Sequence, residues 1–369
     1  MAVAIAAFPG RYLQGPGTLR QAPAEISKYG SDVLLISDPY VAENIWPAYA
    51  QDFQRDLNIH LIAFGGECCE DEINKTAAKA VDAGCNVIVA LGGGKTIDAA
   101  KAVAYYLNLP VIIIPTAAST DAPCSAVSVV YEPDGRVKTV LKLKSNPQAV
   151  IMDTEIIAKA PVRLLISGMG DALATWFEAD SVWRTQQTNT LGALPLRTAH
   201  RLARLCYDTI AQYGVLAKQA CEQGIVTPAL EYVVEANTLL SGIGFESGGL
   251  GASHAIHNGL TVLEGTHHYL HGEKVAYGLL SSLFLTGRDP QLIKEVYKLF
   301  GEIGLPTRLK DIGLSGVGRD ELMQAAQAAC HPGSNIYHEA GEITPARVCD
   351  AMLAADAYGQ SFQQGQAFS

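Results

Sequence analysis

Five of the nine histidines of this 369-residue chain fall within one short segment, residues 251–274. His254 and His257 are three residues apart in a stretch with helical periodicity, so we expect them on roughly the same face of a helix. The other three, of which His271 is the last, follow a glycine-containing loop directly before another helical stretch. Catalytic zinc takes about three protein ligands of the histidine or carboxylate type and keeps one position open. The segment is therefore either part of a metal site or a cluster of surface histidines without a metal.

A carboxylate that could complete such a site is Asp171. It follows Gly168 and Gly170, and we expect it at the start of a helix. An aspartate in that position also has an ordinary structural explanation, because it accepts hydrogen bonds from free amides and favours the positive end of the helix dipole. On the residues alone, metal ligand and helix cap both stay open.

Three consecutive glycines, Gly92–Gly94, mark a second candidate site. They follow an apolar run and precede a helical stretch, within the sequence ALGGGKTID at residues 90–98. Glycines let a phosphate approach the backbone closely, the amides at a helix N-terminus bind anions, and Lys95 could add a positive charge. The pattern is neither GxxxxGK[ST] nor GxGxxG, so a purely structural glycine turn is the alternative.

Two further segments have residues that could contact a nucleotide. Asp38 ends an expected strand, where a carboxylate can accept hydrogen bonds from the adenine-ribose hydroxyls and repels a 2′-phosphate. This favours NAD over NADP, although a simple turn or cap aspartate is an equal alternative. Residues 114–131 begin at the end of another expected strand and are rich in small and hydroxyl side chains, which suit either a cofactor or an ordinary polar loop.

The first half of the chain has the pattern of a Rossmann-like α/β domain with a mostly parallel sheet. Continuous apolar runs, typical of strands buried on both faces, occur at residues 33–37, 59–64, 86–91 and 111–115. Helical patterns at residues 71–84 and 96–107 alternate with them, which is the βαβ order of doubly wound folds. Asp134-Gly135, between two β-prone stretches, predicts a hairpin, and a strand at residues 149–153 ends this half.

After Pro161 the pattern becomes helical. Alanine- and leucine-rich segments with helical periodicity cover residues 162–183, 195–213, 228–243, 248–262, 273–286, 290–303, 318–330 and 344–364. We therefore expect an α/β domain at residues 1–160 and an all-α domain at residues 161–369.

Composition excludes several classes of function. A net charge of −10 argues against nucleic acid or an anionic membrane as the partner. No run of roughly 18 apolar residues occurs, and no basic segment precedes the short apolar start, so neither a membrane span nor a cleaved signal peptide is expected. The eight cysteines form no CxxC pair, and we expect reduced thiols and a cytoplasmic protein.

Long blocks of the sequence resemble the glycerol dehydrogenase family, within the iron-containing alcohol dehydrogenase superfamily. They include LGGGKTIDAAKA at residues 91–102, PTAASTDAPCSA at 115–126, GMGDALATWFEA at 168–179, EANTLLSGIGFESGGLGASHAIHNGL at 235–260 and HHYLHGEKVAYG at 267–278. The resemblance extends from about residue 9 to residue 364. It implies a dehydroquinate synthase-like two-domain architecture, in which the N-terminal domain binds NAD and the C-terminal domain binds metal and substrate.

The resemblance also implies roles for individual residues. One Zn²⁺ per subunit would be held by Asp171, His254 and His271, which would act in catalysis through the metal, and Asp121 would contact a polyol. NAD would be bound by Asp38, Gly94, Lys95, Thr116, Ser119, Ser125, Val127 and Tyr131. The reaction would be the reversible, NAD-dependent oxidation of glycerol to dihydroxyacetone through a zinc-bound alkoxide and hydride transfer, with activity on other vicinal diols. Family members are homo-oligomers, often octamers.

The chain departs from the wider superfamily at two positions. The iron enzymes commonly have a histidine four residues after the aspartate ligand, where this chain has Thr175, so three protein ligands remain. Paired histidines that are four apart in the superfamily appear here as His254 and His257, three apart, so a role for His257 does not carry over.

Three alternatives lie outside the polyol assignment. A hydroxycarboxylate dehydrogenase of the same superfamily would need a cation for the substrate carboxylate, and the expected pocket segments contain no arginine. A dehydroquinate synthase-like lyase would need several cations near the metal, and residues 165–180 and 245–275 offer only Lys274. A nucleotide-binding protein without catalysis would need no convergence of the three metal-ligand candidates.

Overall fold

The computed structural model describes residues 3–132 and 137–365 of the chain. The chain forms two compact units. The sheet unit consists of Ala7–Val162 and Gln219–Gly242, and the helical unit consists of Met1–Ala6, Arg163–Lys218 and Ile243–Ser369. The chain leaves the sheet unit after Val162 and returns to it at residues Gln219–Gly242. The assignment of NAD binding to residues 1–160, and of metal and substrate binding to residues 161–369, stays a prediction.

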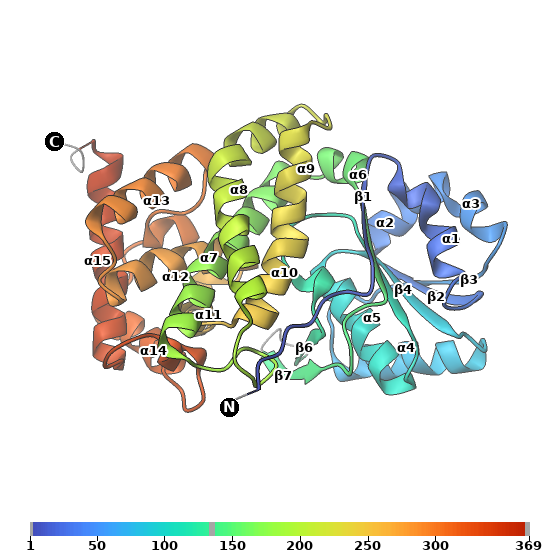
Figure 1. Cartoon of the computed structure of the whole chain (residues 1–369), viewed down its shortest axis with the longest axis horizontal. Helices are drawn as coiled ribbons and strands as arrows, with labels where there is room; N and C mark the ends of the chain where they lie inside the picture. The colour runs from blue at the N-terminus through green and yellow to red at the C-terminus, as the bar shows by residue number, and fades with distance from the viewer. Residues whose placement is uncertain (1–2, 133–136, 366–369) are drawn as a thin grey trace. The chain divides into compact units, whose positions relative to one another are not determined.

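A six-stranded parallel sheet forms the centre of the sheet unit (Figure 1). The strand order is β1-β8-β5-β4-β2-β3. The strands are β1 (Tyr12–Gly15), β2 (Asp32–Ser37), β3 (Asn58–Ala63), β4 (Val87–Gly92), β5 (Val111–Pro115) and β8 (Ala149–Asp153). The predicted parallel α/β sheet is confirmed, and only the short edge strand β1 was not among the predicted strands.

Burial explains why the inner strands have continuous apolar runs. Every residue of β4, β5 and β8 is buried, whereas the edge strand β3 is half-buried or exposed along its length. Val33 and Leu35 of β2 and Val89 of β4 pack with α1 (Ala22–Ile26), α2 (Pro39–Asn44) and α3 (Ala50–Gln54) in one core. A strand covered on both faces needs apolar side chains in both directions.

Two longer helices of this unit follow β3 and β4. These are α4 (Glu70–Asp82) and α5 (Gly94–Leu107), and both confirm the predicted helical stretches. Residues 154–159 form α6 (Thr154–Lys159), and α9 (Pro228–Glu235) comes from the later part of the chain. The predicted hairpin pairs β6 (Val127–Tyr131) antiparallel with β7 (Val137–Lys142), while Asp134-Gly135 lies outside the described residues.

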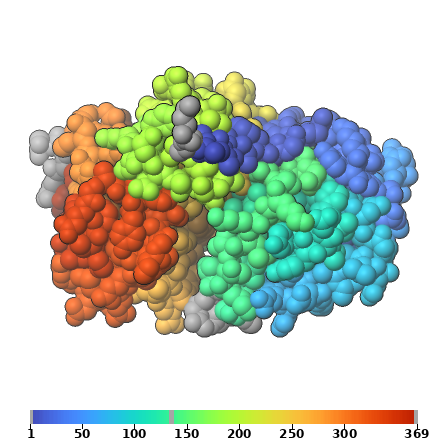
Figure 2. Space-filling model, turned by 60° about the horizontal axis from the view of Figure 1, so that its bottom comes forward, coloured from blue at the N-terminus to red at the C-terminus, as the bar shows by residue number. Residues whose placement is uncertain are grey.

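Residues 163–365, all of which the structure describes, contain no strand, and this confirms the prediction that the second half of the chain is helical. The main helices of the helical unit are α7 (Val162–Thr185), α8 (Arg197–Glu222), α11 (Ala252–Leu260), α12 (His271–Leu285), α13 (Pro290–Ile303), α14 (Arg319–Ala329) and α15 (Pro345–Gln363). A short α10 (Ser241–Ile243) lies between two π-helical turns, η4 (Ala236–Leu240) and η5 (Gly244–Gly248). In the space-filling view the C-terminal helices, coloured orange to red, form a continuous surface of this unit (Figure 2).

No described helix combines the length and the apolarity that crossing a bilayer requires. All eight cysteines lie in the described ranges, and none of them forms a disulfide.

Candidate functional site

Asp171 lies in the middle of a long helix, which confirms the helical stretch predicted at residues 162–183, and the expectation that Asp171 begins a helix is wrong. Helix α7 begins at Val162 and continues through Gly168 and Gly170 without a break. The glycines serve packing instead, because a Cβ atom on Gly170 would lie 2.5 Å from the carbonyl oxygen of Gly272. A residue in mid-helix cannot cap the helix, which removes the structural alternative for this carboxylate.

Three of the sequence-predicted residues converge in the helical unit. His254 is the third residue of α11 and His271 is the first residue of α12. The Nε2 atoms of both rings lie 3.2 Å from Oδ1 of Asp171. One ligand atom from each of the three residues lies within 4.8 Å of the others. Asp171 is fully buried and the side chain of His271 is 37% exposed, so the group is accessible from the His271 side.

Glycine contacts bring Asp171 and His271 together. A Cβ atom on Gly272 would overlap the backbone carbonyl of Ser167, so α7 and α12 approach to a distance that only glycine permits there. His271 immediately precedes Gly272, and Asp171 immediately follows Gly170, the other glycine of this contact. The close approach of the two backbones therefore sets the distance between the two candidate ligands.

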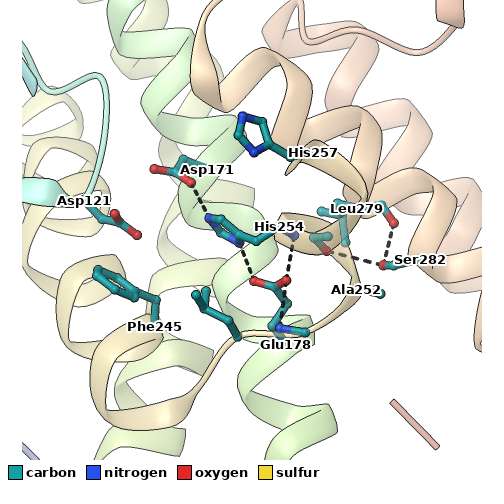
Figure 3. A network of polar contacts seen from close by, with 12 residues as sticks. Asp121, Asp171, Glu178, Phe245, Ala252, His254, His257, Leu279 and Ser282 are labelled. Atoms are coloured by element: carbon teal, nitrogen blue, oxygen red, sulfur yellow. Dashed lines mark hydrogen bonds and ion pairs between the residues drawn. The ribbon is translucent and has the colours of Figure 1, made fainter. Parts of the chain in front are cut away.

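Both imidazoles have a partner on the ring nitrogen that faces away from Asp171. Nδ1 of His254 lies 2.6 Å from Oε2 of Glu178, and Nδ1 of His271 lies 3.1 Å from Nε2 of His257. His257 in turn bonds through Nδ1 to Oδ1 of Asn258, at 3.0 Å. Figure 3 shows the ring of His254 between the carboxylates of Asp171 and Glu178. His257 is therefore a neighbour of the candidate ligands and not a member of the group.

The electrostatics of the cluster favour an ionised carboxylate. Burial acts to raise the pKa of Asp171, but the charge of His271 and hydrogen bonds from both imidazoles hold the pKa well below its ordinary value. Burial, together with the nearby charge of His271, lowers the pKa of His257 well below that of a free imidazole. A neutral His257 can accept a hydrogen bond at Nε2 from the Nδ1–H group of His271.

The donor set fits a divalent transition metal. One carboxylate oxygen and two imidazole nitrogens are the ligand types of catalytic zinc sites, and two histidines with one carboxylate also bind non-haem iron(II). Thr175, one helical turn after Asp171, is fully buried and offers no imidazole. The three residues thus leave coordination positions open for either metal.

Asp38 and the glycine run meet at the carboxyl ends of two adjacent strands in the sheet unit. Strand β2 has β3 on one side and β4 on the other, so the order of the strands reverses at the β2–β4 pair. Open α/β sheets bind ligands at such a point. Asp38 follows β2 and accepts a hydrogen bond from the amide of Val41, at 3.0 Å. A Cβ atom on Gly92, the last residue of β4, would lie 3.0 Å from Oδ2 of Asp38.

The N-terminus of α5 has the features of an anion site. Its N-cap, Gly93, provides no side-chain cap, and a Cβ atom there would meet nothing within 4 Å. Lys95 does not point freely to this site, since Nζ lies 2.6 Å from Oε2 of Glu67 and 5.5 Å from the centre of the Tyr131 ring. An anion at the helix end would therefore compete with Glu67 for the lysine.

The remaining candidate cofactor residues lie on β6 and the loop before it. Thr116 directly follows β5 and donates its amide to the carbonyl of Gly92, at 3.1 Å, and Ser119 is half-buried in the same loop. Ser125 is buried, whereas Val127 and Tyr131 are half-buried at the two ends of β6. These positions follow the carboxyl end of β5, the strand next to β4.

Two buried residues hold this loop and were not found from the sequence. Lys101 of α5 donates from Nζ to the carbonyls of Ala122 and Val127 and to Oγ of Ser125. Ser241 donates its hydroxyl to Oδ2 of Asp121, at 3.0 Å. Both are distant in sequence from the residues they hold, so no local pattern identifies them.

Glu178 is a third residue that sequence analysis missed. It lies seven positions after Asp171, two turns later on the same face of α7, and it is 1% exposed. A glutamate in a buried helical stretch of alanine, tryptophan and phenylalanine is the only sequence feature that could have marked it.

Comparisons with a family model, with known sequences and with solved structures agree on the family of this chain. Residues 9–154 match the iron-containing alcohol dehydrogenase family. A glycerol dehydrogenase from Thermotoga maritima is 52% identical, over 96% of this chain and 97% of that protein. A glycerol dehydrogenase from Escherichia coli O6:H1 is 44% identical, over 96% of this chain and 97% of that protein. The crystal structure of a glycerol dehydrogenase from Schizosaccharomyces pombe matches with a TM-score of 0.96 and 36% identity, over 100% of this chain and 94% of that one.

Proposed function

Because this chain belongs to the glycerol dehydrogenase branch of the iron-containing alcohol dehydrogenase family, we propose that it catalyses the reversible, NAD-dependent oxidation of glycerol to dihydroxyacetone. The observation that carries this proposal is the convergence of Asp171, His254 and His271 from three helices. A purely nucleotide-binding protein has no need to bring these three side chains together. Other vicinal diols, such as propane-1,2-diol and butane-2,3-diol, would be substrates as well.

We propose that Asp171, His254 and His271 hold one Zn²⁺ per subunit. When bound, the ion supplies a Lewis acid that lowers the pKa of an alcohol hydroxyl and so favours its ionisation near neutral pH. Zinc is preferred to iron because Thr175 occupies the position of the fourth ligand of the iron enzymes, and three protein ligands suit an open catalytic zinc site. The buried Asp171 carboxylate balances part of the positive charge.

The cofactor residues divide into three roles. Asp38 would accept hydrogen bonds from the adenine-ribose hydroxyls, and its charge would exclude NADP. The amides of Gly94 and Lys95 at the uncapped start of α5 would bind the pyrophosphate. The other contacts would come from Thr116, Ser119, Ser125, Val127 and Tyr131.

When bound, the nicotinamide would supply the acceptor for the hydride that glycerol loses at C2, and the hydroxyl proton would leave to solvent. The products are dihydroxyacetone, NADH and one proton. Asp121, which is buried and held by Ser241, would accept a hydrogen bond from a second hydroxyl and so orient the donor carbon. The cofactor performs the redox chemistry, and the protein provides orientation and exclusion of water.

We further propose that residues 1–160 form the NAD-binding domain and residues 161–369 the metal- and substrate-binding domain. We expect a cytoplasmic homo-oligomer, and the resemblance to the family favours an octamer. Sedimentation of the purified protein measures its size directly. A monomer at assay concentrations would contradict the oligomer.

The assignment of substrate is tested with a panel of alcohols and NAD⁺, followed by NADH absorbance. Glycerol and the two vicinal diols should be oxidised, and 2-hydroxy acids should not. Turnover of hydroxy acids alone would replace the proposal with a hydroxycarboxylate dehydrogenase. NADP⁺ in place of NAD⁺ should support little activity.

A further inference from the structure

The carboxylate of Glu178 makes three contacts, all to one short segment of α11 and its N-cap. Oε1 accepts hydrogen bonds from the backbone amides of Gly251, at 3.0 Å, and of His254, at 2.9 Å. Oε2 lies 2.6 Å from Nδ1 of the His254 ring. The same side chain therefore holds both the backbone and the imidazole of one candidate metal ligand.

These contacts determine which ring nitrogen of His254 keeps its proton when a metal binds the other. Oε1 already accepts from two backbone amides, and the 2.6 Å contact between Oε2 and Nδ1 fits a third donor on the same carboxylate, so Nδ1 is the donor in this pair. In the metal-free protein a proton on Nε2 lies toward Oδ1 of Asp171, at 3.2 Å, and a metal that displaces this proton meets the Nε2 lone pair because Nδ1 stays the donor to Glu178. A metal ligand must present a lone pair, and the partner of the other nitrogen fixes which one is presented.

We infer that Glu178 is a positioning residue of the metal centre, whose carboxylate holds His254 in the tautomer and orientation that present Nε2 to the metal. The inference rests on the proposed metal site and adds to it a residue that does not touch the ion. It assigns Glu178 a function in metal affinity and not only in the stability of α11.

A simple helix cap is the competing explanation, and the structure contains a control for it. Helix α11 has no cap from its own N-cap residue, Gly251. Glu339 accepts a hydrogen bond from the amide of Ala252, at 3.0 Å, and is 7% exposed. Glu339 thus serves the same helix end as Glu178, but within the described residues its carboxylate bonds to neither the His254 nor the His271 ring. A cap function predicts similar effects for both residues, and a positioning function predicts an effect for Glu178 alone.

The substitution Glu178→Gln separates helix capping from positioning of His254, because the side chain keeps nearly the same shape. The amide has one oxygen acceptor and one NH₂ donor, whereas three donors point at the Glu178 carboxylate. If the oxygen keeps the two backbone amides, the NH₂ group faces Nδ1 of His254. Nδ1 must then accept, and a neutral ring carries its single proton on Nε2, where it blocks metal binding.

The test measures zinc affinity of the metal-free protein by competition with a chromophoric chelator. Loss of a partner to a metal-bound histidine typically weakens metal affinity roughly 10- to 100-fold, and we expect this for Glu178→Gln. Glu339→Gln should bind zinc as the wild type does. Glu178→Asp, which keeps an acceptor-only carboxylate, should retain more affinity than Glu178→Gln. Circular dichroism on each metal-free variant checks that it is folded.

The outcomes distinguish this inference from the proposed function. If the wild type binds zinc and Asp171→Asn does not, the metal site stands. Equal zinc affinity of wild type and Glu178→Gln, or an equal loss in Glu339→Gln, would then overturn only the role of Glu178. No zinc binding by the wild type would overturn both.

A crystal structure of the zinc-loaded wild type tests the inference without any variant, should Glu178→Gln not fold. The expected result is zinc on Nε2 of His254, with the Glu178 carboxylate within hydrogen-bond distance of Nδ1. Zinc on Nδ1, or on Glu178 itself, would contradict it.

Discussion

The backbone of Gly272 lies so close to the carbonyl of Ser167 that a Cβ atom on Gly272 would overlap it. One turn further along α7, a Cβ atom on Gly170 would lie 2.5 Å from the carbonyl oxygen of Gly272. Asp171 and His271 adjoin these glycines in sequence, and their side chains lie 3.2 Å apart. The contact between α7 and α12 therefore sets the geometry of the candidate metal site.

Gly272→Ala should weaken both the fold and the metal site. The added methyl group meets backbone atoms that cannot rotate away, and overpacking of this kind costs about 1–3 kcal/mol of unfolding free energy. Zinc affinity should fall as well, because separating the helices moves His271 from Asp171. Chemical denaturation and chelator competition measure the two effects. Gly301→Ala in α13 is the matched control, since its methyl group would meet only the Phe362 ring, at 3.3 Å, and loss of zinc affinity in that variant alone would refute the account.

Asp38→Asn should relax the choice of cofactor without loss of stability. Asparagine preserves the N-cap of α2, where Asp38 accepts from Val41, but removes the negative charge. Hydrogen bonds to charged groups contribute about 1.5–3 kcal/mol, so the KM for NAD⁺ should rise roughly tenfold or more. The activity with NADP⁺ should increase relative to NAD⁺. An unchanged ratio of kcat/KM for the two cofactors would remove Asp38 from the nucleotide site.

Asp121→Ala should raise the KM for glycerol or change the order of preference among diols. The variant loses a charged acceptor for a substrate hydroxyl, which predicts a decrease of roughly 10- to 100-fold in kcat/KM. Steady-state kinetics with glycerol, propane-1,2-diol and butane-2,3-diol measure the change. Wild-type constants across all three diols would show that Asp121 does not contact the substrate.

Asp98 should make the stability of the protein depend on pH. Burial raises the pKa of Asp98 to about 7, although Lys101 and a bond from the Val129 amide act against the rise. The folded protein then binds this proton more tightly than the unfolded chain, whose aspartate titrates near 3.9. The stabilisation is complete below about pH 4 and is lost as the pH rises through about 7.

Denaturation of wild type and Asp98→Asn at several pH values isolates this effect. As the pH rises from about 4 to 7, the unfolding free energy of the wild type should fall relative to that of Asp98→Asn. Other groups titrate equally in both proteins and cancel. A difference that stays constant across this range would mean that Asp98 ionises with an ordinary pKa.

The parallel sheet could be predicted because burial on both faces leaves a continuous apolar run in the sequence. This holds for β4 and β5, where every residue is buried. The edge strand β1 has the sequence YLQG and is half-buried, so it lacks such a run. Helices α1 and α3, five residues each, are too short to show helical periodicity and were not predicted.

The candidate site shows where local patterns fail. Gly168 and Gly170 indicated a helix start at Asp171, because glycine is a poor helix former, but tertiary packing against α12 requires Gly170 inside α7. Glu178 could not be assigned because its function depends on His254, which is 76 residues away in the chain. The histidine cluster itself was visible in composition, although the residues alone did not distinguish His254 and His271 from their neighbours.

The most direct test of the central claim follows NADH absorbance with purified protein, glycerol and NAD⁺, before and after removal of metal by a chelator. Activity should disappear with the metal and return on addition of Zn²⁺. Asp171→Asn, folded as judged by circular dichroism, should stay inactive in the presence of zinc. Recovery with Fe²⁺ and not with Zn²⁺ would correct the metal alone. Two results would contradict the proposed function. One is full glycerol oxidation by protein that is shown to contain no metal, and the other is no glycerol oxidation by folded, zinc-loaded protein.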